Sequence, residues 1–430
     1  MSKRKMKDSG VEWLGEIPAE WDVRRGKTFL RLLSRPVKVD DDIVTCFRDG
    51  EVTLRKNRRE DGFTVALKEC GYQGVEPGDL VVHGMDGFAG SIGISDSRGK
   101  ASPVLNVMDT SEDKRYIMYY LRSLAMRDVF LALSTGIRVR SCDLRWSKLG
   151  DIQYLLPPLF TQRKIAAYLD GRCAKIDEMI SGAKKTIEEY KAWKSSAIFE
   201  AVTGKNIIGK KKSSGVEWMG DIPASWSLTP LKYLISDYKA GPFGSSLITA
   251  NLLPAGEILV YTPEHIAKRG TSLENNLYLP VSRREEMSQF IVRPGDVIFP
   301  IVGSLGRAML LGPNNPMGII NQRLAKFRLN PKVVDDRYFM RLFGESDFYG
   351  QHLEVCCRGT IIVNLTKSIV GAMPFPLPPL GVQREIAHQL DAQCLVIERV
   401  IAEKEKMIAD LEAYKKSLIF ECVTGKMEVA

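Results

Sequence analysis

The sequence lacks most of the features that mark catalytic and membrane-spanning proteins. Its 430 residues contain no phosphate-binding G-x-x-x-x-G-K-[ST] loop, no H-E-x-x-H pair and no nucleophile elbow. The four histidines are scattered, and the eight cysteines form no C-x-x-C pair, so a zinc site is not indicated. No apolar run approaches the length needed to cross a bilayer. This pattern is typical of a binding and scaffolding protein, not of an enzyme.

A secretory signal is also not indicated. The N-terminal segment MSKRKMKDSG is basic, but no apolar core follows it. We therefore expect a cytoplasmic protein with reduced cysteines. Cys173 and Cys394 lie at equivalent positions of two predicted helices, where we expect them to pack as small apolar residues.

What the sequence has in excess is positive charge. Its formal net charge is +9 and its isoelectric point is near 9.0. Such a balance favours a polyanionic partner, nucleic acid above all. Because many basic proteins bind no nucleic acid, the net charge alone is only modest support for a nucleic-acid partner.

A proline-flanked motif followed by a long proline-free segment occurs twice. The copies read LPPLFTQRKIAAYLD at 156–170 and LPPLGVQREIAHQLD at 377–391. Both segments end in a matching tail, IFEAVTGK at 198–205 and IFECVTGK at 419–426. The offset is 221 residues at both ends, so no insertion interrupts either segment. A length kept so strictly indicates that the length itself matters.

A second motif precedes each of these segments and completes an internal duplication. It reads SGVEWLGEIPAEW at 9–21 and SGVEWMGDIPASW at 214–226. From this entry motif to the proline stop the chain runs 147 residues in the first repeat and 163 in the second. The sixteen extra residues therefore fall in the variable region between the motifs. The chain consists of two tandem repeats in the same order, which fixes its architecture.

The entry motif carries two tryptophans in each copy, Trp13 and Trp21, then Trp218 and Trp226. Tryptophans set among glycine and proline usually pin a loop onto a core. We favour that packing role, and base stacking is the alternative.

The two long segments are predicted to form a helix pair. Apolar residues recur in both at alternating spacings of four and three, which is a heptad seam. The predicted packing residues are Ile165, Leu169, Ile176, Ile180 and Ile187 in the first helix and Ile386, Leu390, Ile397, Ile401, Ile408 and Leu411 in the second. Lys194 and Lys415 interrupt the two seams at the same level, where a polar residue can fix the register. The alternative is an amphipathic helix that lies on one domain.

The variable regions, 22–155 and 227–376, have the pattern of α/β domains with short strands. Pro-Gly-Asp turns between β-rich runs match at 77–79 and 294–296. A glycine-rich stretch follows each turn, and in the first it spaces Gly87, Gly90 and Gly93 evenly. That spacing is not a dinucleotide-binding fingerprint. Elsewhere the two regions diverge, as expected for one fold with two sets of loops.

The predicted fold is therefore α/β (α+β), with two similar domains separated by a pair of long antiparallel helices that form a coiled coil, and with pseudo-twofold symmetry from the tandem repeat. The predicted boundaries are 1–155 for the first domain, 156–205 for the first spacer helix, 206–213 for a basic linker, 214–376 for the second domain and 377–430 for the second helix and tail.

Together, the two entry motifs, two LPPL-x-x-Q-R-x-IA-x-x-LD stops and two IFE-x-VTGK tails resemble the specificity subunit of type I restriction–modification systems. The resemblance covers essentially the whole chain, including Gly241–Ser246 and Ile320–Arg323 in the second variable region. The first variable region departs from those local patterns.

The resemblance implies two target-recognition domains that each read one half of a bipartite, asymmetric double-stranded DNA target with a fixed gap. It implies two methyltransferase (M) subunits docked on the chain, and restriction (R) subunits in the full complex. S-adenosylmethionine, ATP and Mg would be used by those partners, with no cofactor or metal bound by this chain. The specificity subunit would itself be non-catalytic, in a complex that methylates adenine and cleaves DNA.

Base readout requires polar or cationic side chains on loops that reach the major groove. The candidates, chosen by charge and loop position, are Arg48, Lys56, Arg58, Arg138 and Arg140 in the first domain and Lys239, Phe243, Ser245, Ser246, Arg307, Arg358 and Thr360 in the second. For any single arginine, a phosphate contact or a solvated surface charge is the alternative.

Two other functions stay open on the sequence alone. One is a specificity subunit of another bipartite system whose partner fuses modification and cleavage. The other is a free-standing bipartite DNA-binding regulator, which would bind DNA without enzymatic partners.

Overall fold

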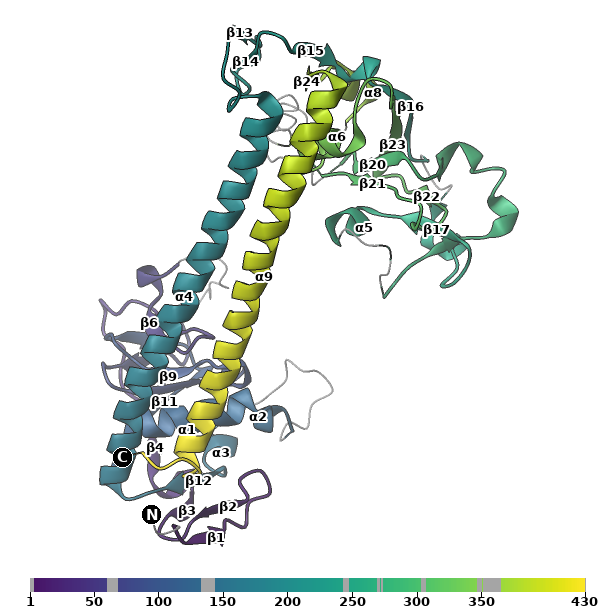
Figure 1. Ribbon diagram of the computed structural model, residues 1–430. Coiled ribbons are helices and arrows are strands. Elements are labelled where there is room, and N and C mark those ends of the chain that lie inside the picture. Colours follow the sequence, from purple (N-terminus) through teal and green to yellow (C-terminus); the bar gives the residue numbers. More distant parts are fainter. Residues whose placement is uncertain are drawn as a thin grey trace. The chain divides into compact units, whose positions relative to one another are not determined.

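The computed structural model describes residues 4–59, 69–132, 144–242, 247–268, 271, 274–302, 307–345, 350 and 365–429. It contains two compact units. Unit 1 comprises Met1–Lys184 and Glu405–Ala430, and unit 2 comprises Lys185–Lys404. The two long helices, α4 (Leu159–Thr203) and α9 (Leu380–Val423), therefore contribute one end each to both units (Figure 1).

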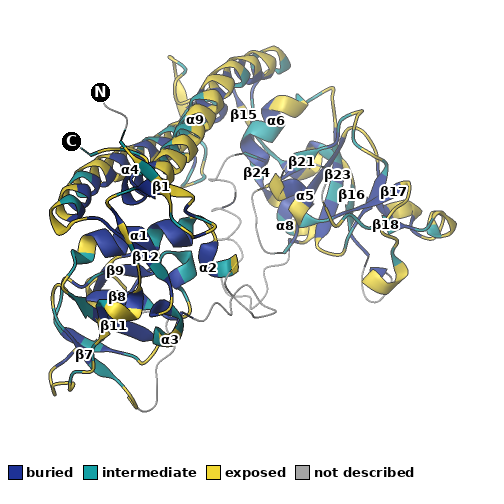
Figure 2. Ribbon diagram, turned by 90° about the horizontal axis from the view of Figure 1, so that it is seen from below, coloured by how far each residue is buried: buried dark blue, intermediate teal, exposed yellow. Residues whose placement is uncertain are grey.

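Unit 1 is built on a four-stranded antiparallel sheet in the order β4-β11-β8-β9. The helix α1 (Lys114–Met126) packs on this sheet, and its N-cap residue Asp113 accepts hydrogen bonds from two backbone amides. Figure 2 shows both layers as largely buried. The other elements of unit 1 are β1 (Met6–Asp8), β2 (Glu16–Pro18), β3 (Asp22–Arg25), β4 (Leu30–Leu32), β5 (Val44–Cys46), β6 (Val52–Leu54), β7 (Gln73–Val75), β8 (Leu80–His83), β9 (Ile92–Ile94), β10 (Gly99–Ala101), β11 (Leu105–Thr110), α2 (Val129–Ala132), α3 (Trp146–Leu149) and β12 (Gln153–Leu156).

Unit 2 repeats this sheet as β16-β23-β20-β21 and adds a second four-stranded sheet, β18-β17-β22-β19, in which β17 and β22 are parallel. The longer second variable region thus carries a sheet that has no four-stranded counterpart among the described residues of unit 1. Its elements are β13 (Lys211–Ser213), β14 (Asp221–Pro223), β15 (Ser227–Pro230), β16 (Ile235–Ala240), β17 (Ile258–Tyr261), α5 (Pro263–Lys268), β18 (Tyr278–Leu279), β19 (Ile291–Val292), β20 (Asp296–Pro300), β21 (Met309–Leu310), β22 (Gly318–Ile320), β23 (Leu324–Leu329), α6 (Asp336–Phe343), α8 (Lys367–Ala372) and β24 (Pro374–Leu377).

The equivalent turns of the two units have the same geometry. In each Pro-Gly-Asp turn the glycine, Gly78 or Gly295, has a φ of +87°, a conformation that glycine adopts without strain. The aspartate that follows, Asp79 or Asp296, accepts a hydrogen bond from the amide three residues earlier. The turn sequence therefore fixes the entry into β8 and β20.

Within each unit the ends of α4 and α9 run antiparallel and share one hydrophobic core with the sheet. In unit 1, Ile165, Leu169 and Ile176 of α4 pack in one cluster with Leu418 and Val423 of α9. The same cluster contains Ile180, Ile408 and Leu411. In unit 2, Ile198 and Val202 of α4 share a cluster with Ile386 and Leu390 of α9. Ile187 and Ile397 are buried, and Ile401 is half-buried.

The two polar seam residues form equivalent interhelical ion pairs. Lys415 Nζ lies 2.6 Å from Asp177 Oδ2 in unit 1, and Lys194 Nζ lies 2.5 Å from Glu398 Oε1 in unit 2. Both the lysines and the acidic residues are 221 positions apart, so this is one contact made twice. Each unit thus pairs its helices in the same antiparallel register. Because the acidic partners are more than half exposed, we assign these pairs a role in register more than in stability.

In each unit, the hydroxyl of a buried tyrosine contacts both the C-terminal end of one long helix and a β-strand of the domain. Tyr116 Oη lies 3.0 Å from the carbonyl oxygens of both Leu155 and Val423, which share its one hydroxyl proton. Tyr338 Oη makes the equivalent bonds to Pro376 and Val202, also at 3.0 Å. Both tyrosines are fully buried. The end of α9 is therefore bonded to the first domain and the end of α4 to the second.

The glutamine of each proline-stop motif is a buried cap. Gln162 Oε1 accepts from the Asp113 amide at 3.0 Å, and Gln383 Oε1 accepts from the Asp335 amide at 2.8 Å. Their Nε2 groups donate to the carbonyls of Pro157 and Pro378, each at 2.8 Å. Because neither side chain is exposed, every polar atom needs such a partner.

The entry motif of each unit packs against the tail of the helix that arrives from the other repeat. A Cβ on Gly425, at the end of α9, would lie 2.5 Å from Pro18 and 2.9 Å from Trp21. A Cβ on Gly204, at the end of α4, would lie 2.6 Å from Pro223 and 3.0 Å from Trp226. Trp21 and Trp226 are buried, which agrees with the packing role of the entry motif.

Candidate nucleic-acid interface

Seven of the twelve base-reading candidates lie outside the described residues. These are Arg138, Arg140, Phe243, Ser245, Ser246, Arg358 and Thr360. The structure therefore gives geometry for Arg48, Lys56 and Arg58 in unit 1 and for Lys239 and Arg307 in unit 2.

The three described candidates of unit 1 lie around the β5–β6 hairpin, and each is paired with a carboxylate. Arg48 Nη2 lies 3.1 Å from Asp86 Oδ1. Arg58 lies 2.6 Å from Asp49 Oδ2 and 2.9 Å from Glu51 Oε2, and its hydrogen bond lowers the pKa of Asp49 below the ordinary value. Lys56 is paired with Asp42. These acidic partners hold the side chains in defined positions, so a DNA contact would have to share or replace an existing ion pair.

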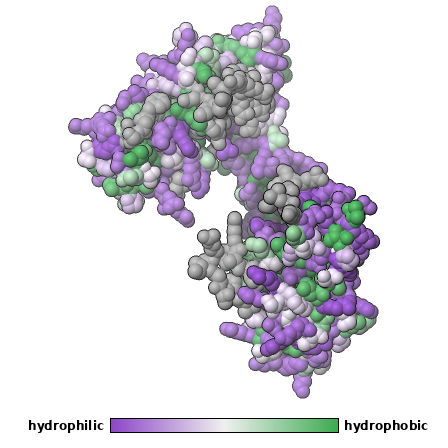
Figure 3. Space-filling view, turned by 180° about the vertical axis from the view of Figure 1, so that it is seen from behind, coloured by the Kyte–Doolittle hydropathy of each residue, from purple (hydrophilic) through white to green (hydrophobic). Residues whose placement is uncertain are grey.

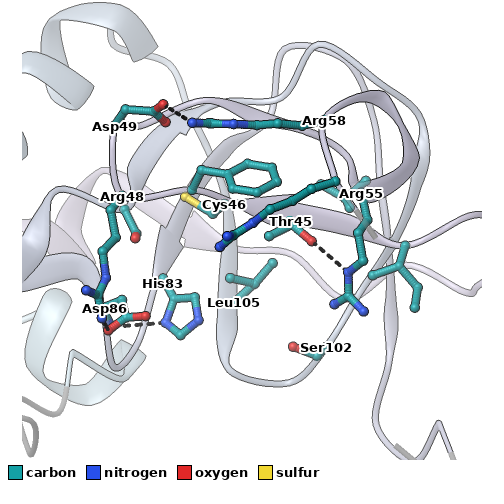
Figure 4. A pocket seen from close by; sticks show the side chains of 15 residues that line it. Thr45, Cys46, Arg48, Asp49, Arg55, Arg58, His83, Asp86, Ser102 and Leu105 are labelled. Atoms are coloured by element: carbon teal, nitrogen blue, oxygen red, sulfur yellow. Dashed lines mark hydrogen bonds and ion pairs between the residues drawn. The ribbon is translucent and has the colours of Figure 1, made fainter. Parts of the chain in front are cut away.

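Arg48 and Arg58 both line a cavity of about 750 Å³ beside the β5–β6 hairpin (Figure 4). Phe47 forms part of the wall, and the Arg58 guanidinium lies 4.3 Å from the centre of its ring. Arg55 lies across the cavity from Arg48 in Figure 4, and its Nε donates to Thr45 Oγ1 at 3.3 Å. The structure thus brings two predicted residues together in one site and leaves Lys56 out of it.

The cavity wall also holds polar and charged side chains that were not among the sequence candidates. Arg55 and Arg59 line the cavity with Arg58, and His83 enters it from the end of β8. The cluster RKNRR at 55–59 was a visible signal. The sequence spacing does not connect His83 with this cluster, because the strand β8 approaches the β5–β6 hairpin only through tertiary packing.

The candidates of unit 2 do not form one site. Lys239 lies on β16 with its Nζ 5.6 Å from the centre of the Phe290 ring, a cation–π distance. Arg307 is exposed and precedes β21.

His83 gives unit 1 a predicted pH dependence. Burial lowers the pKa of His83 below its ordinary value of about 6.5. The neutral ring therefore stabilises unit 1 fully above about pH 6.5, and this contribution is lost as the pH falls through the lowered pKa. We expect His83→Gln, which keeps a hydrogen-bond acceptor, to flatten the fall in melting temperature between pH 7.5 and 5. A wild-type slope equal to that of the variant would contradict the assignment.

The described residues also limit the chemistry of the site. Among them, no group of three or more His, Cys, Asp or Glu side chains could hold a metal ion. No helix in the same residues is long and apolar enough to cross a membrane. The described cavity of unit 1 is lined by polar and cationic side chains, Arg48, Arg55, Arg58 and Arg59 among them.

No family model matches the chain. Among curated proteins, the chain is 23% identical over 425 residues to the type I restriction enzyme MjaVIII specificity subunit of Methanocaldococcus jannaschii, covering 96% of this chain and 94% of the relative. It is 22% identical over 449 residues to the putative MjaX specificity subunit of the same organism, covering 97% and 96%. It is also 22% identical over 369 residues to the EcoBI specificity subunit of Escherichia coli, covering 82% and 74%.

A solved structure has the same fold. A chain from a structure on complex assembly and conformational transition of the type I restriction–modification system superposes with a TM-score of 0.72. The alignment covers 96% of this chain and 99% of the other, at 14% sequence identity. The predicted fold class, α/β domains with long helices between them, is confirmed.

Proposed function

We propose that this chain, a homologue of type I restriction enzyme specificity subunits over nearly its whole length, is the DNA-recognition subunit of a type I restriction–modification complex. Such subunits are non-catalytic, and the chemistry lies in their partners. The observation that carries the proposal is the duplicated construction: each unit combines one variable domain, one entry motif and both long helices in one register.

The physics of DNA recognition accounts for this construction. Two half-sites on one face of B-DNA lie about one helical turn apart, or a multiple of about 34–36 Å. A flexible linker would leave that gap undefined, whereas a helix of 45 residues extends about 68 Å and resists bending. In the proposed mechanism the loops of each variable domain read one half-site, and the paired helices set the gap.

The surface of the helices supports two equivalent partner sites. Trp193 on α4 is 58% exposed and Tyr414 on α9 is 54% exposed. The two aromatic residues are 221 positions apart, and each precedes one of the register lysines. Most of the surface drawn in Figure 3 is hydrophilic, so exposed aromatic residues at repeated positions favour two copies of one partner. We propose that these copies are M subunits.

We expect Trp193→Ala and Tyr414→Ala each to remove one partner copy, since a central aromatic truncation weakens binding about 30-fold or more. The complex should fall from two M subunits per chain to one, and the double variant should bind none. Native mass spectrometry of the co-expressed complex measures this. Tyr233→Ala is the control, because this residue is 66% exposed but lies in a short 3-10 helix, Leu231–Tyr233, outside the two long helices α4 and α9. Two M subunits on the double variant would rule out this docking surface.

The proposed roles of the subunits also determine which of them bind cofactors. We propose that the chain binds no S-adenosylmethionine, ATP or Mg, and that M and R subunits use them in the bacterial or archaeal cytoplasm. The chain would contribute sequence readout, and a flipped adenine would enter an M subunit.

The proposal is tested by mapping methylated adenines across a host genome after the chain is expressed with its neighbouring methyltransferase. We expect one split motif with a constant gap. Contiguous methylation, or none, would contradict it. Tight DNA binding by the purified chain without any methylation would instead favour a free-standing regulator.

A further inference from the structure

The main sheet of unit 2 carries a cluster of cations on one of its faces. Lys326 and Arg328 are two positions apart on β23, so they lie on the same face. Lys239 of β16 is the direct partner of Lys326 in the sheet register, which places it on that face as well. Phe327, between the two β23 cations, packs on the opposite face with α6. The cluster therefore spans two neighbouring strands.

A β-bulge in β16 sets the position of Lys239. From Ser236 to Lys239 the strand β16 advances three residues, whereas its partner β23 advances two. Inside the bulge Asp237 has a φ of +52°, which is uncommon for a residue other than glycine. The extra residue lets Tyr238 pack in the core on the α6 side and turns Lys239 to the face of Lys326. Bulges that re-aim a side chain in this way are frequent beside functional sites.

The two lysines converge on the edge of the second sheet. Lys326 Nζ donates a hydrogen bond to the carbonyl of Ile291. Lys239 Nζ lies 5.6 Å from the centre of the ring of Phe290, the preceding residue. Like charges that stand directly opposite each other in a sheet are destabilising. An anion at this point would remove that repulsion.

Asp296 is the carboxylate with which the β23 cations pair. Its Oδ1 lies 2.8 Å from Arg328 Nη2, and its Oδ2 lies 3.8 Å from Lys326 Nζ. Lys239 forms no ion pair with any residue that the structure describes. Three cations therefore share one carboxylate, which leaves an excess of two positive charges.

Solvent reaches this cluster. The side chain of Arg328 is 42% exposed and that of Lys326 is 14% exposed, and Lys239 is partly exposed. Burial lowers the pKa of Lys326 below its ordinary value, because its ammonium has lost part of its hydration. Asp237 and Arg293 act on Lys326 with opposite signs, so together they leave the excess of charge unchanged.

The equivalent face of unit 1 is not cationic. Counted from the Pro-Gly-Asp turns, the strand register makes Val107 equivalent to Lys326 and Asp109 equivalent to Arg328. Val107 is fully buried in an apolar cluster, and Asp109 is paired with Arg31. Because both units form the same sheet, the fold does not require cations at these positions. They are a property of the second repeat alone.

The donors of the cluster suit a phosphate group. Arg328 directs its Nε and Nη2 at Asp296, and its Nη1 remains as a donor. Diagonal neighbours in an antiparallel sheet are about 7–8 Å apart, within the joint reach of a lysine and an arginine side chain. A phosphate between Lys239 and Arg328 would accept a charge-assisted hydrogen bond from each.

We propose that Lys239 and Arg328 bind one phosphate group, and that in the assembled complex it is a backbone phosphate of the DNA at the half-site of unit 2. Lys326 is a positioning residue, which shares Asp296 with Arg328 and adds positive potential. The assignment to DNA rests on the proposed function, whereas binding of a phosphate does not. Lys239 would then hold the DNA in place and not read a base, which fits its position on a strand.

The test compares wild type with Lys239→Gln in the full chain co-purified with its methyltransferase partner. Affinity is measured by fluorescence anisotropy over a range of salt concentrations, for a duplex with the methylated motif and for an unrelated duplex. We expect the slope of log affinity against log salt to become smaller by about 0.9 for both duplexes. Affinity for both should fall about tenfold. The methylated motif and the melting temperature should stay the same, since Lys239 has no ion pair to lose.

Lys332→Gln is the matched control. It removes the same charge from an exposed position of unit 2 that precedes α6, on the other side of the sheet. Its salt slope should equal that of wild type.

Inorganic phosphate, titrated against chloride at equal ionic strength, distinguishes the source of the phosphate group. A rise in melting temperature that Lys239→Gln abolishes identifies a site that also takes free phosphate. A change in the DNA slope without such a rise identifies the DNA backbone as the ligand.

An unchanged salt slope in Lys239→Gln, with no phosphate-dependent rise, would overturn the proposal, and a split methylation motif would still be observed. A variant that methylates a different motif would also overturn it, because Lys239 would then read a base. Contiguous methylation, with a phosphate effect that depends on Lys239, would instead remove the proposed function and leave the phosphate site standing.

Discussion

Lengthening both long helices by one heptad at their repeat-equivalent midpoints should abolish methylation of the original motif. The insertions follow Lys185 and Lys406, which are 221 residues apart. Seven residues add about 10 Å to each helix, or about three base pairs of DNA. Three base pairs turn the duplex by about 100°, whereas a heptad turns the helix seam by only about 20°. One half-site would leave its reading surface, and methylation should fall at least about 100-fold.

Genome-wide mapping of methylated adenines measures this result. Any remaining sites should carry both half-sites unchanged, with a gap about three base pairs longer. A four-residue Gly/Ser insertion after Ile208, which is fully exposed between α4 and β13, is the control and should preserve the motif. Full methylation of the original motif by the heptad variant would show that the helices do not set the gap.

Alanine at Gly204 or Gly425 should destabilise the unit that contains it by about 3 kcal/mol. Both glycines have a left-handed backbone, with φ of +68° and +71°, and strain of this kind costs about 1–3 kcal/mol. The new Cβ would also overlap Pro223 or Pro18 at 2.6 or 2.5 Å, and overpacking costs a further 1–3 kcal/mol or so. The expected observation is a lower denaturant midpoint for the affected unit.

Two kinds of control separate the cost of backbone strain from the cost of steric overlap with the new Cβ. Gly15 and Gly220 each have a φ of +66°, and a Cβ added there would have nothing within 4 Å, so alanine should show backbone strain alone. Gly182 lies in the exposed face of α4 with nothing within 4 Å, so alanine should stabilise by about 0.5–1 kcal/mol. Equal effects at Gly204 and Gly220 would mean that the helix tail does not pack tightly on the entry motif.

Much of the architecture could be predicted because the chain contains two tandem repeats with the same order of motifs. The constant offset of 221 residues delimited both long helices, and the seam spacing identified their packing faces. Lys194 and Lys415 stood out as polar seam residues because they are equivalent. Their partners, Glu398 and Asp177, became evident only in the structure, since any antiparallel register was compatible with the spacing.

Other features could not be read from the sequence because they depend on which copies pair. The entry motif at 9–21 could pack on the tail of its own repeat or on that of the other, because the two tails differ at only one position, Ala201 and Cys422. The contacts of Gly204 and Gly425 decide for the second. The cavity joins Ser91, His83 and Arg58 from separate strands and turns, and no periodicity links them. Base-reading roles for Arg138 and Arg140 stay predictions, since both lie outside the described residues.

The most direct test of the account is the methylation map of a chain in which residues 22–156 are replaced by a copy of 227–377. These limits keep the paired strands β15 and β24 together, and they bring Tyr338 into the position of Tyr116, whose bond to Val423 it can replace. If each variable domain reads one half-site and the helices set a pseudo-twofold gap, the motif should become symmetric: the half-site of the second domain, the original gap, and the same half-site inverted. An unchanged asymmetric motif, or a symmetric motif with a different gap, would contradict the account.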